Sequence, residues 1–130
     1  MIRVLIPSDA DFYLYENQLR KLYLESQERL CDTNSFEFVR DNTLFYMFLS
    51  GNIPIGGIYY FIDDGKLFLN GFAKRKNLIA NLYCLSLSTT WFSCDIYAEA
   101  QNKASALCLL RCGFERVKDN LFCFKKSSYE

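Results

Sequence analysis

The sequence predicts an α+β fold with a mixed central sheet flanked by helices, and three observations lead to this prediction. The length of 130 residues fits one domain, because single domains commonly contain about 100–150 residues. The hydrophobic period changes from helical to strand-like and back along the chain. The composition, 51% apolar and 17% aromatic, is sufficient for a packed core. We therefore expect residues 1–130 to form a single domain.

The amino-terminal third is predicted to contain a strand and two helices. Residues 1–6 alternate loosely and form the expected first strand, after which Ser8 or Asp9 is the expected helix cap. Between residues 11 and 26 the apolar side chains recur with a helical period. A second, shorter helix is expected to begin at Ser35, because serine is a favoured cap.

The middle of the chain is predicted to be a three-stranded antiparallel meander, since short turn sequences separate its apolar runs. One turn contains Asp63, Asp64 and Gly65. Two adjacent carboxylates are also a candidate metal-binding or catalytic pair, but Asp-Gly is ordinary hairpin chemistry, and we favour the turn. The predicted strands are residues 43–49, 53–62 and 66–72.

The carboxy-terminal half is predicted to alternate helices and strands. A helical period follows Lys74, residues 91–98 alternate as a fifth strand, and residues 121–125 form the last strand. Between these two strands, Asn102 is the expected cap of a helix and Gly113 its expected end. The apolar side chains of this last helix are Ala104, Leu107, Cys108 and Leu110. The predicted order is therefore β-α-α-β-β-β-α-β-α-β.

The composition excludes several classes of chemistry and partner. The chain has no histidine, so a histidine-based triad, metal site or proton switch is excluded. Fifteen basic residues are balanced by fifteen acidic ones, so we expect no nucleic-acid partner, and the zero net charge favours a protein partner. No apolar run approaches the roughly 18–20 residues of a membrane span, so we expect no membrane partner.

The cysteines indicate a reducing compartment. Most of them lie in apolar runs, and a chain of this length needs no disulfides, so we expect reduced core thiols in a cytoplasmic protein. A metal site at Cys108 and Cys112 is the alternative, but no second pair stands at ligand spacing, and we predict no metal. The six cysteines are Cys31, Cys84, Cys94, Cys108, Cys112 and Cys123.

The segment from Asn102 to Phe114 resembles the carboxy-terminal motif of the GNAT acyltransferases, in which Asn begins a helix and Gly-Phe follows at the same spacing. The element order is also similar, so the likeness covers nearly the whole chain. The resemblance implies acetyl-CoA as cofactor and an amine as acyl acceptor. It also implies a splay between the fourth and fifth strands that exposes the backbone of Asn70, Gly71 and Phe72 to the pantetheine arm.

GNAT enzymes bind the cofactor pyrophosphate at a Gln/Arg-x-x-Gly-x-Gly/Ala turn that opens a helix. Arg75 and Ala80 fit this pattern, whereas Leu78 stands where the family has glycine. The basic run 74–76 either attracts the pyrophosphate or is a solvated turn, and the sequence leaves both open. The cofactor-binding residues implied by the resemblance are Asn70, Gly71, Phe72, Arg75, Lys76, Asn77, Leu78, Ile79, Ala80 and Asn102.

The resemblance assigns no catalytic residue. In many GNAT enzymes a tyrosine on the last helix protonates the leaving thiolate, and the corresponding position here is Leu109. Tyr97 and Glu99 alternate on the predicted fifth strand and are a candidate acid and base. Polar residues on one face of a strand are more often its solvent-facing side, and we favour that interpretation.

A narrower resemblance concerns residues 71–76, Gly-Phe-Ala-Lys-Arg-Lys. They are similar to a segment of the small GNAT-like internal virion or head-assembly proteins of short-tailed bacteriophages. This likeness implies a GNAT fold with a degenerate acyl-CoA site, weak or no transferase activity, and virion or assembly proteins as partners. The location would then be the host cytoplasm or the virion. The alternative is an active small acetyl-CoA-dependent N-acyltransferase.

Overall fold

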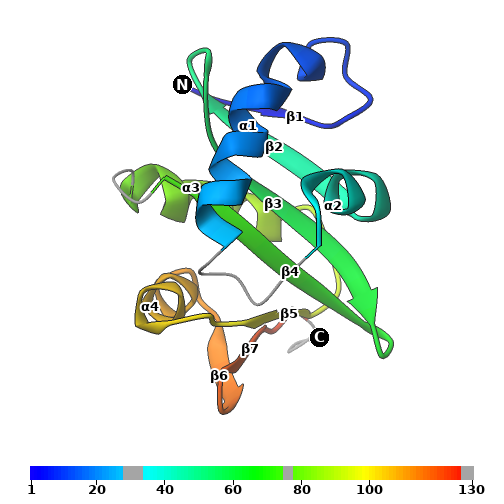
Figure 1. Ribbon diagram of the computed structural model, residues 1–130. Coiled ribbons are helices and arrows are strands. Elements are labelled where there is room, and N and C mark those ends of the chain that lie inside the picture. Colours follow the sequence, from blue (N-terminus) through cyan, green and yellow to red (C-terminus); the bar gives the residue numbers. More distant parts are fainter. Residues whose placement is uncertain (28–33, 75–77, 127–130) are drawn as a thin grey trace.

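The computed structural model describes residues 1–27, 34–74 and 78–126, and these form one seven-stranded sheet with helices on both faces (Figure 1). The strand order is β1-β2-β3-β4-β5-β7-β6, in which β4 and β5 pair parallel and the other neighbours pair antiparallel. The strands are β1 (Ile2–Leu5), β2 (Leu44–Ser50), β3 (Ile53–Asp63), β4 (Lys66–Ala73), β5 (Ile96–Glu99), β6 (Glu115–Lys118) and β7 (Leu121–Phe124). The helices are α1 (Phe12–Ser26), α2 (Phe36–Asn42), α3 (Leu78–Thr89) and α4 (Lys103–Arg111). The predicted α+β class with a mixed sheet is confirmed.

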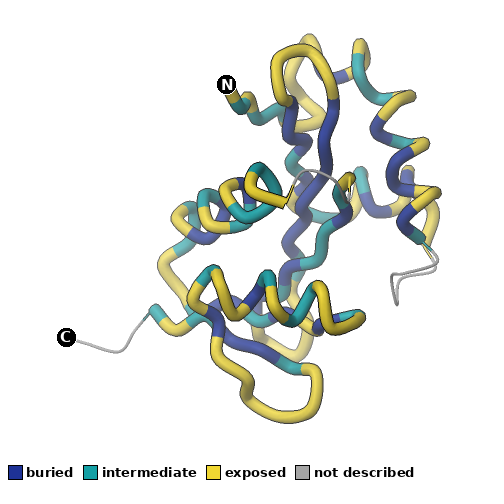
Figure 2. The backbone as a smooth tube through the Cα atoms, turned by 90° about the vertical axis from the view of Figure 1, so that its left-hand side faces the viewer, coloured by how far each residue is buried: buried dark blue, intermediate teal, exposed yellow. Residues whose placement is uncertain are grey.

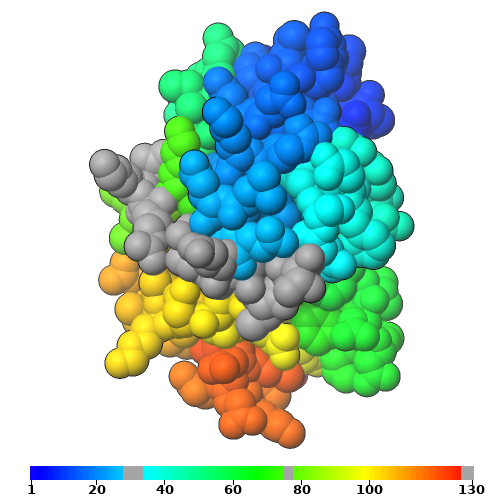
Figure 3. Space-filling view, viewed as in Figure 1, coloured from blue at the N-terminus to red at the C-terminus, as the bar shows by residue number. Residues whose placement is uncertain are grey.

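Two apolar clusters pack on the two faces of the sheet. Side chains of α1 and α2 pack with Phe45, Tyr59 and Phe72 on one face. The other cluster joins α3 and α4 to the sheet through Cys84 and Leu109. The buried residues follow the central strands, which run through the middle of the molecule (Figure 2). In the space-filling view, α1 and α2 cover much of one face of the sheet (Figure 3).

Local capping chemistry explains where several elements begin and end. The Ser35 hydroxyl accepts from the Phe38 N–H at 3.0 Å and caps α2, as predicted. Asp64 and Gly65 have φ of 52° and 73°, so the β3–β4 connection is the predicted tight turn. Gly113 has φ of 97° just beyond α4, which confirms the predicted glycine helix end.

The fold differs from the prediction in the start of one strand, in one further strand and in the cap of one helix. The fifth strand begins at Ile96 and not at residue 91, because Trp91 and Phe92 lie in a loop and pack their rings on the sheet instead. Strand β6 was not predicted, since all four of its residues are exposed and lack an apolar alternation. Helix α1 is not capped by a side chain: its N-cap is Asp11, while the Asp9 carboxylate accepts from the Ile6 N–H at 2.8 Å.

The predicted apolar face of α4 and one predicted core thiol are also corrected. Leu107 and Leu110 are 55% and 47% exposed, whereas Leu109 is the buried residue of this helix. Cys94 is exposed because it lies in the loop before β5. Cys84 and Cys123 are buried as predicted, the five described cysteines are free thiols, and Cys31 lies outside the described residues.

None of the described helices is both long and apolar enough to cross a membrane.

Candidate functional site

The candidate site lies where β4 and β5 separate. The parallel ladder between them runs from the pair Leu67 and Ile96 to the pair Leu69 and Ala98. Strand β4 continues to Ala73 with pairing to β3 alone. The predicted splay between the fourth and fifth strands is therefore present, and it leaves one edge of β4 without a strand partner.

Backbone groups of β4 face this gap. The Lys74 N–H donates to the Ile55 carbonyl of β3 at 3.1 Å, and alternate residues of an antiparallel pair turn their backbone groups to opposite sides. Gly71 and Ala73 therefore direct their N–H and C=O groups away from β3, toward the gap. The Gly71 N–H donates to the Asn70 side-chain oxygen at 2.8 Å. This side chain therefore satisfies a backbone donor that would pair with a neighbouring strand in a continuous sheet.

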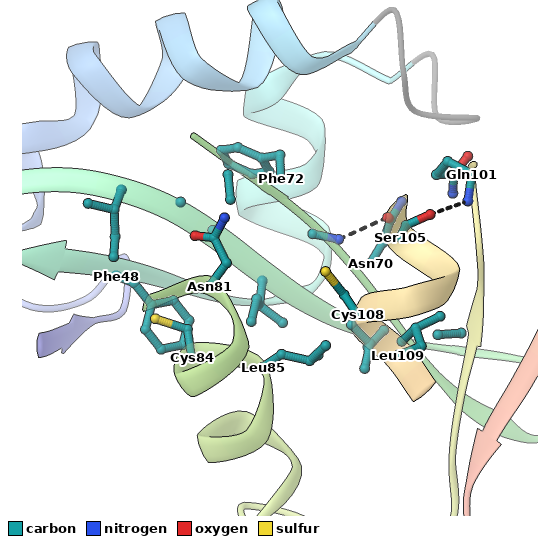
Figure 4. A pocket seen from close by; sticks show the side chains of 18 of the residues that line it. Phe48, Asn70, Phe72, Asn81, Cys84, Leu85, Gln101, Ser105, Cys108 and Leu109 are labelled. Atoms are coloured by element: carbon teal, nitrogen blue, oxygen red, sulfur yellow. Dashed lines mark hydrogen bonds between the residues drawn. The ribbon is translucent and has the colours of Figure 1, made fainter. Parts of the chain in front are cut away.

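A cavity of about 230 Å³ lies in the gap between these strands and the helices α3 and α4, and we call it the first cavity. Its lining is largely apolar, with side chains of α3 and α4 pointing inward (Figure 4). A Cβ added at Gly71 would lie 3.1 Å from the Gly57 carbonyl oxygen and 3.4 Å from Ile58 Cγ1, so a larger side chain there would crowd β3 where it lines the cavity. The helices contribute Asn81, Cys84, Leu85, Ser105, Cys108 and Leu109.

A capping box fixes the start of α4 beside this cavity. The Asn102 side-chain oxygen accepts from the Ser105 N–H at 2.9 Å, and the Ser105 hydroxyl accepts from the Asn102 N–H at 3.0 Å. The Gln101 N–H also donates to the Ser105 hydroxyl, at 2.9 Å. This network orients Cys108 and Leu109 toward the cavity, while Asn102 itself is exposed and is not part of the lining.

Only Leu78, Ile79 and Ala80 of the predicted pyrophosphate turn fall within the described residues. Leu78 and Ile79 begin α3 and are 45% and 84% exposed, and neither they nor Ala80 line the cavity. The Asn81 amide donates to the Lys74 carbonyl at 2.9 Å and joins α3 to the end of β4. Arg75, Lys76 and Asn77 lie outside the described residues.

A second cavity of about 260 Å³ has a more polar lining. It shares Leu69, Asn70, Glu99 and Gln101 with the first cavity, so these residues form the wall between the two. The Asn70 amide donates to the Tyr59 hydroxyl at 3.0 Å. The remaining lining residues are Asn34, Phe61 and Phe68.

The structure separates the candidate acid and base. Glu99 lines both cavities, whereas Tyr97 lines neither and instead packs against the Phe68 ring, with 5.7 Å between centroids. Interaction with the neighbouring Cys123 is the main cause that raises the pKa of Tyr97. Of this candidate pair, Glu99 lines a cavity and Tyr97 does not, so the structure does not bring the two side chains together at one cleft.

Two thiols in the first cavity stay protonated at neutral pH. Burial raises the pKa of Cys84 to about 11 and also raises the pKa of Cys108. The described residues contain no group of three or more Cys, Asp or Glu that could hold a metal ion. The cavity is therefore an apolar slot with protonated thiols.

The seven-stranded mixed sheet, its four helices and the splay at β4 and β5 are the GNAT acyl-CoA N-acyltransferase fold. An N-acetyltransferase from Staphylococcus aureus Mu50 matches with a TM-score of 0.69 at 11% identity, over 95% of this chain and 93% of that one. A GNAT-family acetyltransferase from Brucella melitensis, solved in complex with acetyl-CoA, matches with a TM-score of 0.59 at 10% identity, over 100% of this chain and 91% of that one. A GNAT-family acetyltransferase from Streptococcus pneumoniae matches with a TM-score of 0.55 at 10% identity, over 95% of each chain.

No protein-family model matches the sequence, and neither does any curated protein. At the identities of the solved structures, the likeness shows the fold alone.

Sequence reasoning missed the α3 side of the first cavity and, apart from Asn70 and Glu99, the lining of the second cavity. Asn81, Cys84 and Leu85 form one wall, but their spacing along α3 is ordinary for a helix packed on a sheet. The second cavity combines residues from β3, β4, β5 and the segments after α1 and β5. The sequence offers no local signal for such an assembly.

Proposed function

We propose that the chain binds an acyl-CoA in the first cavity and transfers the acyl group to an amine slowly or not at all. The observation that carries this proposal is the apolar cavity at the exposed β4 edge, where the parallel ladder ends at Leu69 and Ala98.

The cavity and the strand edge suit a pantetheine arm. The arm is extended and carries two amides, so it can pair with backbone groups in the way an added strand does. Ala73 and the Gly71 carbonyl supply such groups, whereas the Gly71 N–H is already bonded to the Asn70 side chain. The bound acyl-CoA would supply a thioester, and the chain would hold it between β4 and α4.

The pyrophosphate would lie at the start of α3. The first N–H groups of a helix have no partner within the helix and favour an anion. Leu78, Ile79 and Ala80 begin α3, and the wide exposure of the first two leaves their surroundings open to a ligand. We infer that the site is degenerate because Leu78 brings a branched side chain where glycine would let phosphate oxygens approach the backbone.

Slow transfer is supported by the residue at position 109. The leaving thiolate needs a proton, and general acid catalysis contributes about 10²–10⁴-fold to such steps. Leu109 is 5% exposed, lines the cavity and has no proton to donate. Glu99, which lines both cavities, favours the second candidate function, an active N-acyltransferase with this carboxylate as base.

Isothermal titration with acetyl-CoA tests the binding proposal, and a thiol-release assay with a primary amine separates the two functions. We expect micromolar affinity, about −8 kcal/mol, and thiol release close to the uncatalysed rate. Rapid release would favour the active enzyme, and no binding would contradict both candidates.

A pair of matched variants locates the binding. Cys108→Phe places a ring in the first cavity and should abolish acetyl-CoA binding. Leu107→Phe introduces the same ring one residue earlier, at an exposed position outside the cavity, and should leave the affinity unchanged. Equal affinities for the two variants would contradict this location.

We also propose that the chain associates with virion or assembly proteins of a short-tailed phage, in the host cytoplasm or the particle. The likeness at residues 71–76 supports this, and so do exposed apolar side chains on α3 and α4, including Ile79, Tyr83 and Leu107. Mass spectrometry of purified particles of an encoding phage tests it. Absence of the chain from particles and from their assembly intermediates would contradict the proposal.

A further inference from the structure

The second cavity has an aromatic floor. The rings of Phe61 and Phe68 are stacked, with 5.9 Å between centroids and 14° between planes. Tyr97 extends this row from β5, 5.7 Å from Phe68. Phe61 and Phe68 are only half-buried, so part of the aromatic surface is accessible to a ligand in the cavity.

The cavity wall carries a negative charge. Glu99 is the charged residue among the described lining, and the other polar groups there are the amides of Asn34, Asn70 and Gln101. No ion pair within residues 1–27, 34–74 and 78–126 involves Glu99. Lys66, whose ammonium lies 5.7 Å from the Tyr97 ring centroid, is not part of the lining. A carboxylate above an aromatic floor favours a cation that has a flat apolar body.

The size of the cavity restricts the ligand to a small molecule. Its volume of about 260 Å³ lies just below the range of roughly 300–1,000 Å³ that is typical of pockets for drug-sized ligands. A single ring with a short side chain fits this volume, whereas a folded polypeptide surface would contact much more than the seven lining residues that the structure describes.

We infer that the second cavity binds a small primary arylalkylamine, with its ring on Phe61 and Phe68 and its ammonium at Glu99. The inference deepens the proposed function and rests on it for the role of this amine, which would be the acyl acceptor. The wall that both cavities share at Asn70, Glu99 and Gln101 is where the amine would meet the thioester.

The transfer balances in atoms and charge. An ammonium and a thioester give an amide, a free thiol and one proton. A carbon–nitrogen bond forms, and the carbon–sulfur bond breaks. The ammonium loses one proton to Glu99 or solvent before attack, and the nitrogen's second proton replaces the one that the thiolate takes up.

Titration with 2-phenylethylamine, followed by calorimetry or by chemical-shift changes, tests the inference. Two analogues separate its parts: 2-cyclohexylethylamine keeps the charge without the flat ring, and 3-phenylpropionate keeps the ring with the opposite charge. We expect saturable binding of 2-phenylethylamine, about threefold weaker binding of the cyclohexyl analogue and no binding of the anion.

Variants assign the binding to the named residues. Glu99→Gln should weaken 2-phenylethylamine about tenfold, and Phe68→Leu about threefold. Glu115→Gln and Phe38→Leu make the same chemical changes at exposed positions outside both cavities and should change the affinity less than about twofold. Glu99 is exposed, so we expect Glu99→Gln to fold. This variant therefore still tests the inference if Phe68→Leu does not fold.

Acetyl-CoA titrated in parallel separates this inference from the proposed function. If acetyl-CoA binds but 2-phenylethylamine does not, or if the amine binds equally well to Glu99→Gln, the inference is wrong and the proposed function stands. If the amine binds in a Glu99-dependent manner but acetyl-CoA does not bind, the inference is supported as a binding site and the proposed function fails. If neither ligand binds, both are wrong.

Discussion

Leu69 of β4 lies opposite Ala98 of β5 in the last pair of their parallel ladder, and both side chains line the first cavity. The next residue, Asn70, lines both cavities. Its side-chain amide donates to the Tyr59 hydroxyl, and its side-chain oxygen accepts from the Gly71 N–H. The end of this ladder therefore determines where the first cavity lies and where the wall between the two cavities lies.

The capping box at α4 should contribute measurably to stability. Asn102→Ala removes the acceptor for the Ser105 N–H, and the loss of such a cap costs about 1 kcal/mol. Asn102→Asp keeps a side-chain oxygen and is the matched control, with an expected change below about 0.5 kcal/mol. Urea unfolding at pH 7 measures both. Equal stability of the alanine variant and the parent would show that the box does not stabilise α4.

Alkaline pH should destabilise the fold through Cys84. Burial raises its pKa from 9.0 to about 11, so the unfolded chain releases the thiol proton first as the pH rises. This contribution to stability is fully present below about pH 9 and is lost as the pH rises through about 11, which gives a loss of about 2 kcal/mol between pH 8 and pH 10.5.

Cys84→Ala isolates this contribution. The variant should lose less stability than the parent between pH 8 and pH 10.5, by about 2 kcal/mol, whatever its stability at pH 8. Urea unfolding of both proteins at the two pH values is the measurement. Burial also raises the pKa of Tyr60, and Tyr60 is present in both proteins, so its contribution cancels in the comparison. Parallel pH profiles for the two proteins would contradict the assignment.

The sequence was sufficient to predict the elements that local chemistry determines. Ser35 and Asn102 cap helices through their own side chains, and Asp64 and Gly65 form a hairpin turn by adopting positive φ. These signals depend on residues within a few positions of each other. The splay between the fourth and fifth strands came from the family resemblance and not from such a signal.

Tertiary packing decided the features that the sequence predicted wrongly. Trp91 has the β propensity of a strand residue, yet its ring stacks on Phe48 with 8° between planes and holds a loop on the sheet. Helix α4 has apolar residues on more than one side, and the cavity side takes Leu109 while Leu107 and Leu110 face solvent. Neither choice can be made from a single hydrophobic period.

Acetyl-CoA should bind more tightly at the predicted pyrophosphate turn when Leu78 is replaced by glycine. Leu78→Gly removes a branched side chain from the first residue of α3 and should increase acetyl-CoA affinity, although glycine costs a helix up to about 1 kcal/mol relative to alanine. Leu78→Ala is the control for loss of bulk alone. In a thermal-shift assay, the glycine variant should melt below the parent without ligand and show the larger ligand-dependent increase. A large shift in the parent with no gain in the variant would show that leucine is tolerated and the site is intact.

Introducing a tyrosine hydroxyl at position 109 should provide a proton donor for the leaving thiolate. Leu109 lies in the first cavity at 5% exposure, so a tyrosine there would direct its hydroxyl into the space that the thioester would occupy. Leu109→Tyr should therefore increase thiol release from acetyl-CoA in the presence of a primary amine by about tenfold or more. Leu109→Phe brings the same ring without the proton and should match the parent. Because both rings reduce the cavity equally, a rate increase in the tyrosine variant alone isolates the hydroxyl, even if both variants bind acetyl-CoA more weakly. Fast release by the parent, with no gain in the tyrosine variant, would mean that protonation does not limit transfer, and the active N-acyltransferase would then be the better account of this chain.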